Sequence, residues 1–296
     1  MKIYRGIVLR TVTLGPSLVR ITLGGPGVAD FVSTGTGDEY VRLFFPHGDD
    51  PTDVSLPIAT ADSWETAEGT PEAPMRTFTI REVRPELGEL DIDFVIHPTG
   101  IAGPWAAAAQ PGHVLGLNSP TGLYAPPEGT EWQVLAADLT GLPAVARIIA
   151  SVPETIRTRV VIEVPSDADR IALPAGANVD VTWVFSGNGH GPSALGQIVR
   201  SVINPRFSFD HGYVWVAGET VALRDVRKFL RRELELPATQ FKVVGYWTPV
   251  AQWESKYAAL PAAVQQELMS MWDVAEDADL AEVELRYEAR LGELGL

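Results

Sequence analysis

The hydrophobic pattern of the chain changes once, close to residue 130, and this change constrains the fold more than any other feature. Before it, short segments such as Val19–Leu23 alternate apolar and polar residues, which is typical of strands with one buried face. After it, unbroken apolar segments such as 159–164 and 213–217 alternate with helical patterns, which is typical of buried parallel strands. The sequence therefore predicts two different domains, joined near Pro126–Gly129.

The first pattern predicts a closed antiparallel Greek-key β-barrel over residues 1–126. A long polar loop is expected at 47–74 and one short helix at 105–109. Six short strands suffice to close such a barrel. The expected strands lie at 4–13, 18–24, 40–45, 76–84, 90–97 and 114–117.

The second pattern predicts a parallel-sheet α/β nucleotide-binding domain over residues 130–247, followed by a C-terminal helical extension over 248–296. In the last helix before the extension, Arg227, Lys228, Arg231 and Arg232 are expected on a solvated face. The expected strands are 133–137, 159–164, 179–185, 213–217 and 241–245, and the helices 141–151, 192–202 and 221–235. Apolar residues at helical spacing predict two further helices, around 264–272 and 280–291.

Composition narrows the possible chemistry. The 296 residues contain no cysteine and five scattered histidines, so thiolate metal sites, cysteine nucleophiles and disulfides are excluded, and no permanent metal site is expected. Any redox chemistry therefore needs an organic cofactor. A formal net charge of −15 weighs against nucleic acid and anionic membranes as partners. Without a signal-peptide core or an apolar window of membrane length, we expect a cytoplasmic protein with no membrane insertion. A monomer is the default expectation.

Residues 75–122 contain the most suggestive local chemistry. Arg76 provides a fixed cation on a strand, and Gly103-Pro104 precedes a short helix whose first N–H groups could bind an anion. This combination suits a diphosphate, although an ordinary hairpin followed by a capped helix would have the same residues. Two later strand ends, 138–143 and 217–220, carry turn-and-cap sequences, with Thr140 predicted as a helix N-cap. Neither contains a GxGxxG fingerprint.

Eight segments stand in a specific order and spacing: Leu18–Pro26, Asp38–Pro46, Arg76–Arg81, Asp93–His97, Gly103–Ala106, Thr140–Ala144, Val216–Glu219 and Gly245–Trp247. In this order they resemble the siderophore-interacting proteins, which are FAD-dependent ferric-siderophore reductases related to ferredoxin–NADP reductases. The resemblance runs from about Val19 to Trp247 and so covers most of the chain.

The resemblance implies a set of cofactor-binding residues. The family's Arg-x-Tyr-Thr flavin motif falls on Arg76, Phe78 and Thr79, with Arg76 on the FAD diphosphate, Phe78 packed on the cofactor and Thr79 near the isoalloxazine ring. Ile80, which follows the motif, is also implied to bind the cofactor. Those implied to hold the ribityl chain and diphosphate are His97, Gly103, Pro104, Trp105 and Ala106. Those implied at the nicotinamide pocket and beside the flavin are Thr140, Gly218, Glu219, Tyr246 and Trp247.

The chain departs from the family pattern at three places. Phe78 lacks the hydroxyl of the usual Tyr, and Asp138-Leu-Thr-Gly141 replaces Asp-Glu-Thr-Ala and so loses an acidic group. Thr248 follows Tyr-Trp where a basic residue is common. The substrate-side cation must then come from elsewhere, and Lys256 is the candidate, with a solvated surface lysine as the alternative.

The resemblance implies transfer of electrons from NAD(P)H through FAD to siderophore-bound Fe(III), with no side chain acting as acid, base or nucleophile. The acidic charge favours hydroxamate chelates over triply negative catecholates. Loop 186–189 offers no cation for a 2′-phosphate, which favours NADH, and reduced ferredoxin is another possible donor. Two alternatives stay open: a general NAD(P)H:flavin or ferredoxin-type oxidoreductase, and a non-catalytic siderophore-binding protein.

Overall fold

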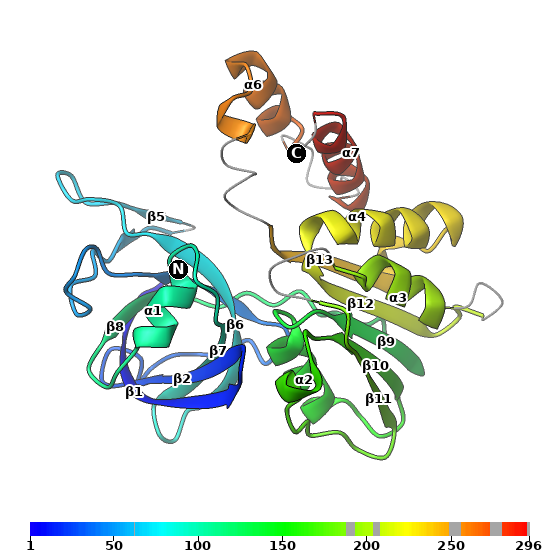
Figure 1. Cartoon of the computed structure of the whole chain (residues 1–296), viewed down its shortest axis with the longest axis horizontal. Helices are drawn as coiled ribbons and strands as arrows, with labels where there is room; N and C mark the ends of the chain where they lie inside the picture. Colours follow the sequence, from blue (N-terminus) through cyan, green and yellow to red (C-terminus); the bar gives the residue numbers. More distant parts are fainter. Residues whose placement is uncertain (62, 188–192, 204–207, 249–255, 273–279, 295–296) are drawn as a thin grey trace.

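The computed structural model describes residues 1–61, 63–187, 193–203, 208–248, 256–272 and 280–294. Figure 1 shows a β-barrel on the left, a sheet flanked by helices on the right, and two helices of the extension above them. The predicted fold class, an antiparallel barrel followed by a parallel α/β domain, is confirmed.

The barrel closes through six antiparallel strands in the order β1-β2-β7-β6-β3-β8. Its interior is filled by apolar residues that include Leu43, Ile80 and Leu117, all fully buried. The strands are β1 (Ile3–Gly15), β2 (Leu18–Gly24), β3 (Tyr40–Phe44), β6 (Met75–Arg84), β7 (Glu89–Val95) and β8 (Val114–Asn118), and the 47–74 loop holds the short strands β4 (Ile58–Ala59) and β5 (Trp64–Glu65).

The short barrel helix α1 spans Ala102–Ala108, so it begins three residues earlier than the sequence predicted. It packs against β7 and β2, and Ala102 and Ala106 point into the barrel core.

The second domain is a parallel sheet of five strands in the order β11-β10-β9-β12-β13. Alternate residues of each strand face opposite sides. Leu135 and Ala137 of β9 pack against α2, and Val134 and Ala136 against α3 and α4. The elements are β9 (Trp132–Ala137), α2 (Leu142–Ser151), β10 (Arg157–Glu163), the 3₁₀ turn η1 (Asp167–Asp169), β11 (Val179–Val184), α3 (Leu195–Val202), β12 (Gly212–Glu219), α4 (Thr220–Lys228), the π-helical turn η2 (Phe229–Glu233), the 3₁₀ turn η3 (Ala238–Gln240) and β13 (Phe241–Trp247).

The prediction of a solvated basic face on the helix that α4 and η2 form is wrong for one residue. Arg227 is 3% exposed, and its guanidinium donates to the carbonyl oxygen of Val243 at 3.0 Å. The long aliphatic part of arginine can be buried when its polar end finds a backbone acceptor, so a helical charge pattern alone does not place it in solvent.

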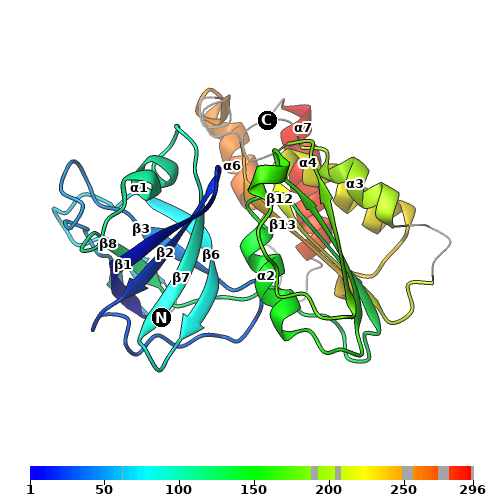
Figure 2. The same cartoon turned by 60° about the horizontal axis from the view of Figure 1, so that its bottom comes forward.

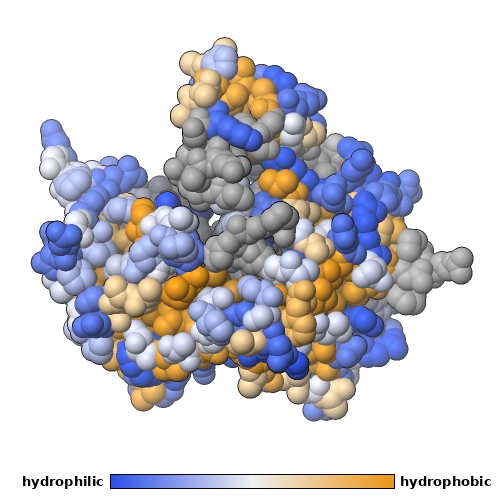
Figure 3. All heavy atoms as spheres, in the orientation of Figure 1, coloured by the Kyte–Doolittle hydropathy of each residue, from blue (hydrophilic) through white to orange (hydrophobic). Residues whose placement is uncertain are grey.

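The helical extension contains α6 (Ala262–Ser270) and α7 (Leu280–Glu293). The two helices pack through Leu268 and Leu291, and Arg290 pairs with Glu267 at 2.8 Å. Figure 1 places α7 beside α4, with α6 further toward the barrel, and the two helices α4 and α7 are in contact. Figure 3 shows hydrophobic surface at the top of the molecule. In the extension, Met269 and Trp272 are exposed. No helix in the described part of the chain is both long and apolar enough to cross a membrane.

The two domains are joined by buried charges. Asp38, two residues before β3, is buried and accepts a hydrogen bond from the indole nitrogen of Trp215 on β12 at 2.9 Å. Its neighbour Glu39, also buried, pairs at 2.7 Å with Arg147 of α2, whose guanidinium also donates to the carbonyl oxygen of Ile80 at 2.9 Å. Figure 2 shows α2 between the sheet and the barrel. A buried charge is costly when unpaired, so these bonds fix the relative orientation of the domains.

The buried bonds that Asp38 and Glu39 make across the domain interface, called the seam below, yield a stability prediction. Arg147→Met keeps the apolar stem but leaves the Glu39 carboxylate without its cation, so we expect a loss of about 3–5 kcal/mol in the free energy of unfolding. Urea unfolding followed by tryptophan fluorescence measures it.

Arg159→Met is the matched control. The ion pair between Arg159 and Asp180 is 3.9 Å long, and the two side chains are 52% and 72% exposed. Removing this pair should therefore lower the free energy of unfolding by about 0–1 kcal/mol. Equal losses for the two variants would contradict the role assigned to the seam.

Candidate functional site

One edge of β6 is left open where the barrel meets the second domain. Residues Met75–Thr79 pair with β3, whereas the pairing of β6 with β7 runs only from Ile80 to Arg84. Among the described strands, Met75–Thr79 therefore have a pairing partner on one side only. This gap is a natural place for an extended ligand, because it exposes a strand edge next to α1.

Arg76 brings an unneutralised charge to this opening. It lies opposite the buried Leu43 in the β3–β6 ladder, so its side chain starts on the face that looks into the barrel. Its guanidinium donates to the carbonyl oxygen of Met75 at 2.7 Å, and no carboxylate of the described residues lies within ion-pair distance. A permanently charged fork without a counter-ion suits a phosphate or carboxylate ligand.

An aromatic cluster lines the same end of the barrel. Phe78 packs on Phe94 with ring centroids 4.4 Å apart, and Trp105 of α1 contacts Phe94 at 5.8 Å and Phe45 at 5.6 Å. The indole nitrogen of Trp105 is buried and has no hydrogen-bond partner in the part of the chain that is described. Because buried donors in native proteins are nearly always paired, this N–H points to a ligand acceptor.

Helix α1 sits against His97 at close range. A Cβ added to Gly103 would lie 2.4 Å from the carbonyl oxygen of His97, a distance that only glycine permits. The His97 ring is half-buried, with Nδ1 3.4 Å from the hydroxyl of Thr99. Pro104 is exposed and stands third in the helix, while Ala106 is buried in the barrel core.

The carboxyl ends of the sheet strands meet at a buried carboxylate that sequence reasoning did not assign to the site. Asp138, directly after β9, accepts bonds from the Thr140 amide at 2.9 Å, the Thr140 hydroxyl at 2.6 Å, the Glu219 amide at 2.9 Å and the Trp247 indole N–H at 2.8 Å. Burial raises the pKa of Asp138, while its hydrogen bonds to Thr140 and Trp247 oppose that rise. An aspartate immediately following a buried strand was the available sequence signal.

Two cap assignments follow from this geometry. Thr140 is not the N-cap of α2 as predicted; Gly141 occupies that position, because the Thr140 side chain is held by Asp138. At the other strand end, Glu219 is the N-cap of α4, and its carboxylate accepts hydrogen bonds from the amides of Val221 at 2.8 Å and Ala222 at 2.7 Å. Gly218 gives Asp138 its space, since a Cβ there would lie 2.7 Å from the carboxylate.

Tyr246 connects this sheet edge to the barrel. The hydroxyl of Thr79 on β6 donates to the hydroxyl oxygen of Tyr246 on β13 at 3.3 Å, and burial raises the pKa of that tyrosine.

The structure divides most of the sequence-predicted site residues into two groups. The barrel group is Arg76, Phe78, His97, Gly103, Pro104, Trp105 and Ala106, and the junction group is Thr79, Thr140, Gly218, Glu219, Tyr246 and Trp247. Ile80 is fully buried in the barrel core, and Lys256 is exposed in the segment before α6.

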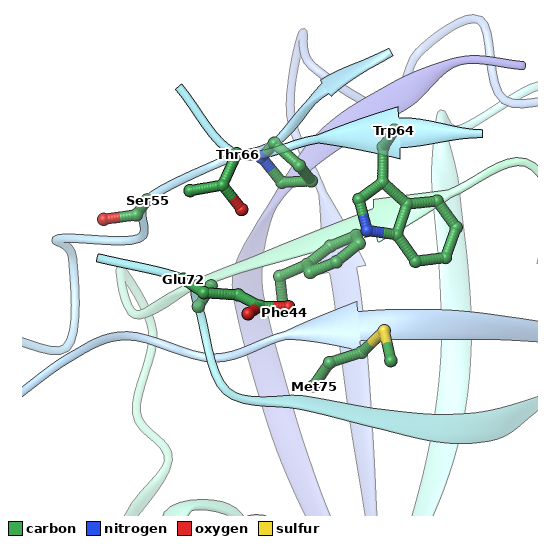
Figure 4. Close-up of a pocket in the computed structure, with 8 residues that line it drawn as sticks. Phe44, Ser55, Trp64, Thr66, Glu72 and Met75 are labelled. Carbon is green, nitrogen blue, oxygen red and sulfur yellow. The ribbon is translucent and has the colours of Figure 1, made fainter. Parts of the chain in front are cut away.

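Two concave features lie elsewhere. Figure 4 shows a pocket where Trp64 folds over Phe44 and Met75; its volume of about 10 Å³ has room for about one water molecule. A groove of about 380 Å³ lies between β6 and α2, where Arg147 pairs with Glu39 at 2.7 Å and Glu82 pairs with Arg84 at 3.1 Å. Neither feature contains the residues of the two groups above.

Known proteins match this chain over both domains. The siderophore-interacting FAD-binding domain matches residues 7–124, and the siderophore-interacting protein domain matches residues 130–249. A siderophore utilization protein from T. fusca has a similar crystal structure, with a TM-score of 0.73 and 32% identity over 84% of this chain and 94% of the other.

Two curated proteins are similar at lower identity. The ferric vibriobactin reductase of Vibrio cholerae is 29% identical over 78% of this chain and 84% of its own length. The NADPH-dependent ferric-chelate reductase of Escherichia coli is 29% identical over 81% of this chain and 91% of its own length.

The close approach of α1 to His97 predicts the effect of a single methyl group. Gly103→Ala forces α1 or His97 to move, and we expect a loss of about 1–3 kcal/mol in the free energy of unfolding, as for other overpacked sites. Ala107→Ser, which adds one atom at an exposed position of the same helix, should be nearly neutral. Chemical unfolding of both variants tests this, and a neutral Gly103→Ala would contradict the tight packing.

Proposed function

We propose that this chain, which belongs to the siderophore-interacting protein family, is an FAD-dependent oxidoreductase that uses NAD(P)H to reduce siderophore-bound Fe(III). The observation that carries the proposal is the contact between Thr79 and Tyr246, because it joins the barrel opening to the carboxyl edge of the parallel sheet. Ligands of such sheets bind at that edge. The names of the Vibrio and Escherichia relatives support the reaction class.

The barrel residues fit FAD on two structural grounds: the unneutralised Arg76 and the orphaned indole N–H of Trp105. In the proposal Arg76 binds the diphosphate, while His97 and residues 103–106 of α1 hold the diphosphate and ribityl chain. Phe78 packs on the cofactor, and Thr79 bonds near its ring. Bound FAD supplies the chemistry, since a flavin accepts two electrons together and releases them singly.

The junction residues would receive the pyridine nucleotide. Thr140, Gly218 and Glu219 edge the nicotinamide pocket, and Tyr246 and Trp247 lie beside the flavin. Loop 186–189, which follows β11, supplies no cation for a 2′-phosphate, and this favours NADH. Residues 188 and 189 of this loop lie outside the described residues. Reduced ferredoxin is the alternative electron donor.

The negative net charge of the chain favours one class of ferric chelate over another. With a net charge of −15, it should repel a triply negative catecholate complex and accept a neutral or cationic hydroxamate complex, with Lys256 as the candidate contact. The iron is substrate, and its reduction releases it because siderophores hold Fe(II) weakly. We place this reaction in the cytoplasm and expect a monomer.

The spectrum of the purified protein tests the cofactor assignment. We expect a bound-flavin spectrum that bleaches anaerobically with NADH or NADPH and returns on addition of ferric chelate. Arg76→Ala should lower FAD occupancy without unfolding the chain, whereas Arg5→Ala, an exposed arginine of β1, should keep it. Full occupancy in Arg76→Ala would contradict the assignment.

The same assays separate the competing functions. Turnover with free flavin or quinone, but not with ferric chelates, would favour a general NAD(P)H:flavin or ferredoxin-type oxidoreductase. A colourless protein that takes up no FAD would favour a siderophore-binding protein without catalysis.

Chelate preference is a separate prediction. Reduction of a ferric hydroxamate should be faster than reduction of a ferric catecholate at low ionic strength. The difference should narrow as added salt shortens the Debye length from about 30 Å at 0.01 M to about 8 Å at 0.15 M. Steady-state rates on both chelates across this range measure it, and faster turnover of the catecholate at low salt would refute the electrostatic argument.

A further inference from the structure

We propose that Asp138 is a positioning residue, which fixes Trp247 as one wall of the pocket that receives the pyridine nucleotide. This inference rests on the proposed function and adds to it a residue that acts through another side chain. Asp138 follows β9, the central strand of the sheet, and Trp247 ends β13 at the sheet edge.

The carboxylate of Asp138 has no capacity left for a ligand or a transferred proton. An ionised carboxylate offers about four acceptor positions. One oxygen accepts from the amide and hydroxyl of Thr140, and the other from the Glu219 amide and the Trp247 indole. The residue is fully buried, so it does not touch a substrate. Its effect on function must pass through the groups that it holds.

A β-bulge aims Trp247 at this carboxylate. In the β12–β13 ladder Gly218 pairs with Gly245, but Glu219 pairs with Trp247, so Tyr246 is the extra residue. Bulges redirect side chains and are frequent beside active sites. Here the Tyr246 hydroxyl reaches Thr79 of the barrel, and the Trp247 indole reaches Asp138.

Trp247 is held at its backbone as well as at its ring. The hydroxyl of Thr220 donates to the Trp247 carbonyl oxygen at 3.0 Å. Gly245 makes this bond possible, because a Cβ there would lie 2.6 Å from the same hydroxyl. Both ends of the residue are therefore fixed with respect to the strand ends that edge the pocket.

A second hydrogen bond between a tryptophan and an aspartate, Trp215 to Asp38, serves for comparison because it lies away from any ligand-accessible surface. Trp215 donates to Asp38 at 2.9 Å and is fully buried at the domain seam. Trp247 makes the same kind of bond but is only partly buried, so part of its ring is available to a ligand at the carboxyl edge of the sheet. The difference in exposure is what points to a role in binding.

The first experiment needs no cofactor. In protein labelled with ¹⁵N-tryptophan, the indole N–H of Trp247 should be protected from solvent exchange and should lose that protection in Asp138→Ala, which removes both acceptor oxygens. Trp247→Phe assigns the resonance by its disappearance. Free exchange of this N–H in the unaltered protein would overturn the proposal, whether or not the protein is a flavoenzyme.

The second experiment separates the two half-reactions of the holoenzyme. Trp247→Phe keeps a smaller aromatic ring and removes the indole donor, so the variant leaves three of the four bonds to Asp138 in place. We expect kcat/KM for flavin reduction by NADH or NADPH to fall about tenfold, the effect of losing one hydrogen bond to a charged group. Reoxidation of photochemically reduced enzyme by ferric chelate should change less than about twofold, because it does not involve the nucleotide pocket.

Trp132→Phe is the control, since it makes the same substitution at a partly buried tryptophan that lies at the amino end of β9, away from the carboxyl edge of the sheet. It should leave the nucleotide half-reaction unchanged. If Trp247→Phe behaves in the same way, the Asp138–Trp247 bond is structural only and the proposal fails. If the protein takes up no FAD, the proposed function fails; nucleotide affinity, titrated by tryptophan fluorescence, then decides the inference, and equal affinity in Trp247→Phe and the unaltered chain overturns it.

Discussion

Two adjacent buried carboxylates, Asp38 and Glu39, hold the molecule together, and the geometry of the candidate site depends on them. Each receives a donor from the other domain, Asp38 from Trp215 and Glu39 from Arg147. A charge removed from water is tolerated only when its partners are fixed, so the bonds leave little freedom for the barrel to turn against the sheet. The contact between Thr79 and Tyr246 is possible because this orientation is fixed.

A buried carboxylate held by several hydrogen-bond donors also stands at the carboxyl edge of the sheet. Asp138 is buried and its acceptor positions are filled by donors from two strand ends and one turn, which brings β9, β12 and β13 to a common point. The barrel opening is built in the opposite way. Arg76 and the Trp105 indole N–H lack the partners that would satisfy them among the described residues. The buried carboxylates at the domain interface and at the sheet edge are hydrogen-bonded, whereas the polar groups at the barrel opening are not. This contrast indicates that the barrel opening binds a ligand.

Local sequence patterns predicted most elements but failed where a side chain serves a distant group. Strand boundaries agree within about two residues because alternation and apolar runs are local properties. Thr140 was predicted as an N-cap because a threonine before a helix usually caps it, yet Asp138 holds its hydroxyl. Arg227 was predicted in solvent from its helical position, yet the carbonyl group of Val243 on another element accepts its bond.

The sequence by itself determined the barrel, the parallel sheet and their order, because hydrophobic periodicity follows from which faces of each element are buried. It also predicted Arg76 and residues 103–106 as ligand-binding groups from their residue type and spacing, and the structure places 103–106 within helix α1. Only the tertiary structure decided that Asp138 joins three strand ends, that a bulge turns Tyr246 and Trp247 to different partners, and that Gly103 must be glycine. These features depend on contacts between residues distant in the chain, and a single sequence carries no local signal for the distances between them.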